Sequence, residues 1–255
     1  MFIRWLFTVF PVEMQAGWRL VRRDLVLWIA LAGLLALASA GAPTEGDPGL
    51  NFATFIGVST ALLTAVLPAI LFEAAARDVE VEWGDVAALL GRKLLPFVAY
   101  ATLAFGLTAA AAVGVQAGMA LVLRGTPLML PLSTAAAAIV SVTLLVRFCF
   151  MPFLVLLHER DEWPAPDGAF GQPLMQLLSW PLVTSSAIGA DVRWRLVPYV
   201  VIIRLGPLLA LAVPPGALLP FLLLWRLFEL TALGVLFQYF IGARRRFGLA
   251  EAEES

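Results

Sequence analysis

Apolar residues in this chain gather into six long stretches, which charged segments or segments rich in proline and glycine separate. The stretches cover residues 24–41, 52–73, 94–122, 129–156, 196–213 and 217–241. Each approaches or exceeds the roughly 20 residues that a helix needs to cross the hydrocarbon core of a bilayer. In lipid, backbone amides must be hydrogen-bonded within the segment, and these runs are too long and unbroken for β-strands. The pattern therefore predicts an all-α membrane protein with six transmembrane helices.

The basic residues predict the orientation of these helices. Thirteen of them precede the first stretch, follow the last, or lie in the loops after the second and the fourth: Arg4, Arg19, Arg22, Arg23, Arg77, Arg92, Lys93, Arg160, Arg193, Arg195, Arg244, Arg245 and Arg246. The opposite loops hold only Arg124. Because basic residues in short loops are retained in the cytoplasm, both termini are predicted to be cytoplasmic. The excess of arginine over lysine and the abundance of alanine favour a bacterial protein, and hence the inner membrane.

Composition agrees with this interpretation and excludes some classes of protein. Of the 255 residues, 61% are hydrophobic, and the mean hydropathy is +0.91, far from the balance of a soluble domain. The net charge of −1 does not favour a nucleic-acid-binding surface. A single cysteine, Cys149, excludes an internal disulfide and provides no thiol cluster for a metal.

Two segments are predicted to lie on the inner surface of the membrane within a single domain of residues 1–255. Residues 1–23 are predicted to form interfacial helices around Pro11, although packing of this segment within the helix bundle is an equal alternative. Residues 157–195 are predicted to form a cytoplasmic loop. Its second half places Leu174, Leu177, Leu178 and Leu182 at helical spacing, which predicts an in-plane helix.

Small residues predict where two transmembrane helices meet. Gly114 and Gly118 in the third stretch have the GxxxG spacing that lets helix backbones approach closely. The fourth stretch contains serine, threonine and alanine over residues 133–141. We therefore expect these two helices to pack tightly as an antiparallel hairpin. Homodimerisation through Gly114 is the alternative.

Four charged residues fall inside the apolar stretches, away from the predicted helix ends. They are Arg147, Arg204, Arg226 and Glu229. An arginine at the bilayer centre costs about 2.5 to 3.5 kcal/mol on insertion scales, so these side chains should face partners within the bundle or water. Arg226 and Glu229 are three residues apart and can share a helix face. Internal pairing, binding of an anionic lipid or other anion, and a conduction path are the three interpretations.

Motifs of common enzymes are missing from the sequence. His158 is the only histidine, and there is no GxSxG, HExxH or GxxxxGK[ST] arrangement. The acidic residues beside His158 lack a second imidazole or a thiolate, so a solvated charged turn is favoured over a metal site. The sequence therefore predicts a protein that is not an enzyme and needs no cofactor.

Three segments resemble a known membrane family. They are residues 17–24 (GWRLVRRD), residues 152–159 (PFLVLLHE), and residues 174–179 (LMQLLS) followed by Arg193-Trp194-Arg195. Together they are similar to the six-helix membrane domain attached to some bacterial glycerophosphodiester phosphodiesterases, and to its free-standing relatives. The resemblance implies the architecture and no activity, because this chain has no histidine-bearing catalytic motif.

The expected function follows from the membrane architecture and the missing chemistry. The first hypothesis is a non-enzymatic integral membrane scaffold or accessory subunit of a larger membrane protein assembly. The alternative is a permease or lipid-handling component that binds an anionic amphiphile near the midplane arginines. The partners expected in either case are membrane lipids and other membrane protein subunits, and no nucleic acid.

Overall fold

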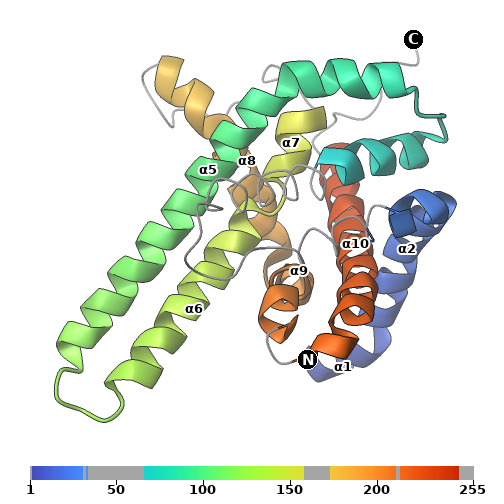
Figure 1. The fold of residues 1–255 in the computed structure, drawn as a ribbon. Helices are drawn as coiled ribbons and strands as arrows, with labels where there is room; N and C mark the ends of the chain where they lie inside the picture. The colour runs from blue at the N-terminus through green and yellow to red at the C-terminus, as the bar shows by residue number, and fades with distance from the viewer. Residues whose placement is uncertain (1, 31–32, 34–65, 158–172, 211–212, 247–255) are drawn as a thin grey trace, which may run out of the picture. The chain divides into compact units, whose positions relative to one another are not determined.

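The computed structural model describes residues 2–30, 33, 66–157, 173–210 and 213–246, and all regular structure in these residues is helical. The helices are α1 (Phe2–Thr8), α2 (Phe10–Arg23), α5 (Trp83–Val122), α6 (Met129–Phe148), α7 (Met151–Leu157), α8 (Pro173–Val192), the 3-10 helix η2 (Arg193–Leu196), α9 (Val197–Ala210) and α10 (Pro215–Arg246) (Figure 1). Residues 25–30 and 66–77 are also helical. The prediction of an all-α fold is confirmed for this part of the chain.

Three described helical segments are long and apolar enough to cross a membrane. They are Gly91–Val122, Met129–Leu157 and Gly216–Arg246, and they correspond to the third, fourth and sixth predicted spans. A shorter apolar helix, Trp194–Ile203, lies at the fifth. Most of the first two predicted spans lies outside the described residues, and their described parts are helical.

The chain divides into two compact units. The first contains Met1–Leu90 with Val201–Gly242, and the second contains Gly91–Val200 with Ala243–Ser255. Helices α5, α9 and α10 each continue along the chain from one unit into the other.

In the first unit, α2 packs directly on α10. A Cβ added to Gly234 would lie 2.8 Å from the carbonyl oxygen of Gly17, so the two backbones touch at these glycines. The Tyr239 hydroxyl donates a hydrogen bond of 2.5 Å to a carboxylate oxygen of Glu13. Residues of α2 therefore contact α10, and the interfacial position of residues 1–23 stays a prediction. Even Trp5 of α1 is buried, with 5% of its surface exposed.

Aromatic rings form the centre of the same unit. Trp28 contacts Phe72 at a centroid distance of 5.5 Å, Phe72 contacts Phe237 at 5.8 Å, and Phe237 contacts Phe240 at 6.2 Å. All four side chains are fully buried. Large rings bury much apolar area and gain further from tilted ring contacts, so this cluster ties residues 25–30 and 66–77 to α10.

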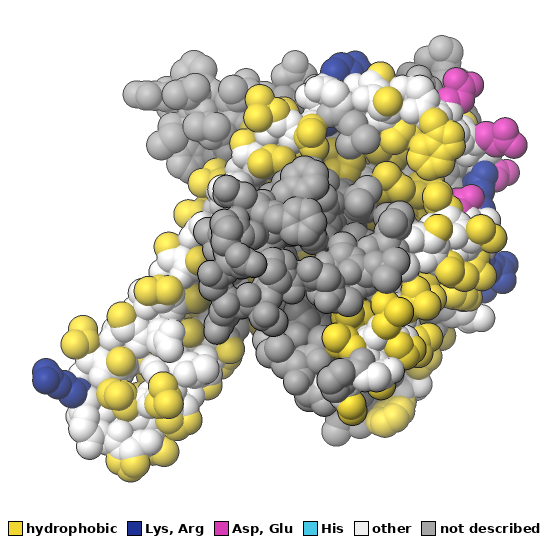
Figure 2. All heavy atoms as spheres, viewed as in Figure 1, with side chains coloured by type: hydrophobic (Ala, Val, Ile, Leu, Met, Phe, Trp, Pro, Cys, Tyr) yellow, Lys and Arg dark blue, Asp and Glu magenta, His cyan; other side chains and the backbone are white. Residues whose placement is uncertain are grey.

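In the second unit, α5 and α6 form a helical hairpin. The turn over residues 123–128 joins them, and Gly125 supplies its positive φ of 82° (Figure 1). Large apolar side chains stay exposed on both helices, among them Phe105 at 70% and Ile139 at 67%. Figure 2 shows hydrophobic side chains spread along the hairpin on the face in view.

Candidate functional site

The membrane-length segment Met129–Leu157 is interrupted between α6 and α7, where Cys149 and Phe150 form a turn. Pro152 explains the position of this break. A proline in a continuous helix has no N–H to donate to the carbonyl four residues earlier, here that of Phe148, and its ring clashes with that carbonyl. The fourth predicted span is therefore two helices in the structure.

Ser185 of α8 hydrogen-bonds to both sides of this break. Its hydroxyl donates to the carbonyl of Arg147 at 2.7 Å and accepts the backbone N–H of Phe150 at 3.2 Å. Ser185 has no exposed surface. Because buried backbone groups need partners, this one hydroxyl stabilises the backbone on either side of the break.

A glycine brings α8 close to the end of α6. A Cβ added to Gly189 would lie 2.7 Å from the carbonyl oxygen of Val146 and 3.2 Å from the Cα of Arg147. No side chain fits there, so the two helices touch through their backbones. The helix predicted in the second half of residues 157–195 is therefore present and packs against α6. Residues 158–172, which include His158, lie outside the described residues.

Arg147 lies in the last turn of α6, one residue before its end. Pro152 ends α6 early, so Arg147 is near the end of α6 but still inside the membrane-length segment Met129–Leu157. Its Nη1 donates to the backbone carbonyl of Ser186 at 3.1 Å and approaches the Ser186 hydroxyl at 3.5 Å. Both of these partners are neutral, so within the described residues the guanidinium is held by neutral groups.

The other three charged candidates belong to the first unit. Arg226 and Glu229 form an ion pair along α10, with 2.5 Å between Nη1 and Oε2 and side-chain exposures of 16% and 6%. Their spacing of three residues places them on one face, as the sequence allows. Arg204 is in α9, and its side chain lies outside the described part of the structure. The structure thus joins Arg226 to Glu229 and places Arg147 in the second unit.

The predicted close packing at Gly114 and Gly118 is not found within the described part of the chain. Both glycines are exposed, and a Cβ added to either would meet no described atom within 4 Å. The close backbone contacts occur instead at Gly17 with Gly234 and at Gly189, because tight crossings with α10 and α6 form there. Contact of Gly114 and Gly118 with another chain stays a prediction.

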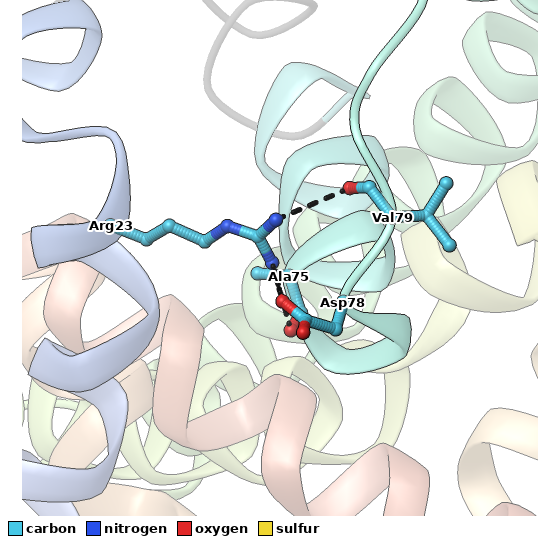
Figure 3. A network of polar contacts seen from close by, with 4 residues as sticks. All are labelled: Arg23, Ala75, Asp78 and Val79. Atoms are coloured by element: carbon cyan, nitrogen blue, oxygen red, sulfur yellow. Dashed lines mark hydrogen bonds and ion pairs between the residues drawn. The ribbon is translucent and has the colours of Figure 1, made fainter.

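A third polar cluster closes the helix of residues 66–77 (Figure 3). Asp78 has a positive φ of 56°, and the N–H of Val79 donates to the Ala74 carbonyl at 3.0 Å, the pattern of a Schellman cap. Arg23 donates to the carbonyls of Ala75 and Val79 at 3.3 and 3.4 Å, and its Nη1 lies 3.2 Å from an Asp78 carboxylate oxygen. The arginine thus stabilises the negative end of that helix.

Among the described residues, no group of three or more histidine, cysteine, aspartate or glutamate side chains could hold a metal ion. No protein-family model, curated protein or solved structure matches the chain.

The sequence did not single out Ser185, Ser186 and Gly189. Their signal was a run of small residues, Thr184-Ser185-Ser186-Ala187, followed by Gly189, within a segment assigned to a surface loop. Small residues are expected where transmembrane helices contact each other. Because this segment was assigned to a loop, no helix contact was predicted from them.

Proposed function

We propose that this chain is a six-span protein of the bacterial inner membrane with both termini in the cytoplasm. In this proposal it serves, without catalysis, as a scaffold or accessory subunit of a larger membrane protein assembly. The basic residues support the orientation, and the three membrane-length helices support the embedding. The resemblance to the six-helix domain of bacterial phosphodiesterases is part of this proposal, as architecture only.

The observation that carries the proposal is the exposure of the α5–α6 hairpin. In the most apolar part of the segment Gly91–Val122, only 11% of the residues are buried, although the mean hydropathy is 1.8. Apolar surface of this extent is stable only against hydrocarbon or a partner. Three hydroxyls of the hairpin suit that surrounding, because Thr108, Ser141 and Thr143 each donate at 2.8 Å to a carbonyl of their own helix.

A partner subunit is favoured over lipid alone along one face of α5. Gly106, Ala110, Gly114 and Gly118 follow one another at intervals of four residues, and all four are exposed. Intervals of four place residues on the same side of a helix, and small residues there admit the backbone of another helix. A Cβ added to Gly106, Gly114 or Gly118 would meet no described atom within 4 Å, so the described chain leaves this face open at its glycines.

Native mass spectrometry after gentle detergent extraction tests this role. We expect the full-length chain to copurify with a defined partner polypeptide, or a second copy of itself, at fixed stoichiometry. The double variant Gly114→Leu, Gly118→Leu should lose that partner, since two leucines keep the helices apart. Gln116→Leu is the control, because residue 116 is about 200° around the helix from Gly114. A monomeric wild-type chain, or a double variant that keeps its partner, would contradict the role.

The lipid-handling alternative has one specific observation in its favour. Arg147 is a membrane-segment arginine whose described contacts are all neutral. Its test does not depend on a partner subunit.

A further inference from the structure

The charge of Arg147 is not balanced by any carboxylate in the part of the chain that the structure describes. Among the described residues, acidic partners are seen for Arg226 (Glu229), Arg77 (Glu73) and Arg23 (Asp78). The described hydrogen bonds of the Arg147 guanidinium go to the carbonyl and hydroxyl of Ser186. A charge in a segment of this hydropathy needs a counter-charge or water, so something outside the described residues must supply it.

Part of the guanidinium has no described partner. Among the described residues, Nη1 is engaged by Ser186. The Nε and Nη2 donors make no described hydrogen bond and are not among the fully buried polar atoms, and the residue as a whole is half-buried. An arginine with one edge fixed and its other donors not fully buried is suited to the two oxygens of a phosphate.

A bilayer boundary at Met129, the start of α6, brings this group near the headgroups on the other side. Arg147 follows Met129 by 18 residues, a rise of about 27 Å in an α-helix. The hydrocarbon core is about 30 Å thick, so a helix that enters it near Met129 carries Arg147 to the opposite boundary. Arginine also extends its apolar stem to bring its charge to the interface. Because the turn over residues 123–128 is predicted outside the cell, that boundary belongs to the inner leaflet.

The partner that orients Arg147 is rigidly placed. Ser185, next to Ser186, bonds to both sides of the α6–α7 break, and Gly189 touches the α6 backbone. These contacts fix the Ser186 carbonyl relative to α6. The guanidinium therefore has a defined direction before any ligand arrives, which lowers the entropy cost of binding.

We propose that Arg147, held by Ser186, binds the phosphate of an anionic lipid headgroup in the inner leaflet at the α6–α7 break. This inference rests on the membrane embedding in the proposed function but not on the accessory-subunit role. The chemistry recognised is a phosphate monoanion. The lipid is favoured over free phosphate because the site lies on a segment that is long and apolar enough to cross a membrane.

Lipid titration of the purified full-length chain in nanodiscs tests the site. Native mass spectrometry should show one phosphatidylglycerol retained in preference to phosphatidylcholine. Arg147→Gln should weaken this retention about tenfold or more, because a charge-assisted bond is lost. Arg147→Lys, which keeps the charge without the planar fork, should give an intermediate loss. Arg124→Gln removes the same charge from the other end of the hairpin and should leave retention unchanged.

Three results would overturn the lipid site. They are equal retention of both lipids by the wild-type chain, full retention by the Arg147→Gln variant, and displacement of phosphatidylglycerol by millimolar inorganic phosphate. If Arg147→Gln does not fold, Arg147→Lys provides the comparison, and full retention of phosphatidylglycerol by that variant would overturn the site. Failure of the wild-type chain to enter nanodiscs would instead contradict membrane embedding, so the two proposals fail in different ways.

Discussion

At the scale of single residues, the Ser185 hydroxyl stabilises the break between α6 and α7. It satisfies the Phe150 N–H and the Arg147 carbonyl at a buried helix break. Ser185→Ala should lower the free energy of unfolding by about 1 to 3 kcal/mol, because both backbone groups lose a partner. Denaturant titration in detergent micelles measures this. Ser141→Ala is the matched control, since its hydroxyl bonds only within α6; equal stability of both variants would contradict the account.

Asp78 gives a second prediction at the same scale. Its φ of 56° suits glycine, and a side chain there costs about 1 kcal/mol. Asp78→Gly removes that cost and also the exposed ion pair with Arg23, which contributes about 0 to 1 kcal/mol. We expect stability equal to or slightly above that of the wild type. Asp78→Ala, which keeps the strained backbone and loses the pair, should be less stable than Asp78→Gly in the same titration.

The ion pair of Arg226 with Glu229 gives the third prediction at the scale of single residues. Arg226→Met removes the cation that lies 2.5 Å from the carboxylate of Glu229, which is only 6% exposed. Breaking such a pair on one side costs about 3 to 5 kcal/mol. Adding Glu229→Gln removes the remaining charge and should recover more than half of the loss. A single variant as stable as the wild-type chain would contradict this prediction.

At the scale of helices, glycine positions separate tight contacts from open faces. Gly17→Ala should destabilise the chain by about 1 to 3 kcal/mol, because its new methyl group would overlap the Thr231 backbone. Gly189→Ala should do the same against α6. Gly114→Ala should be neutral or stabilising in the isolated chain, since its Cβ has open space and alanine favours helices. Equal losses at all three positions would contradict these packing assignments.

The sequence predicted the helix ends that depend on local chemistry. The ends at Val122 and Met129 were predicted correctly, because Arg124 and Gly125 interrupt the apolar pattern. The third span was predicted to start at residue 94, and the membrane-length segment starts at Gly91. The helix itself extends back to Trp83, because charged residues before the span do not stop a helix.

Contacts between distant segments could not be predicted in the same way. Pro152 was visible in the sequence, but the hydroxyl that completes the break comes from Ser185, which lies 35 residues beyond Phe150 in the chain. Similarly, GxxxG spacing directed attention to Gly114 and Gly118, while Gly17 and Gly189 make the close contacts without any such motif. Spacing along one helix indicates which residues share a face, but not which other helix covers it.

At the scale of the whole molecule, the central claim is that the α5–α6 hairpin crosses the membrane and that the chain ends in the cytoplasm. Cysteine accessibility tests this directly, because Cys149 is the only cysteine and can be replaced by alanine. Single cysteines are then introduced by Thr126→Cys in the turn and by Arg246→Cys at the end of α10, both at exposed positions.

In intact bacterial cells, an impermeant maleimide should label the Thr126→Cys variant at once and the Arg246→Cys variant only after permeabilisation. Labelling of both variants in intact cells, or of neither until the cells are opened, would place the two sites on one side of the membrane and contradict the account.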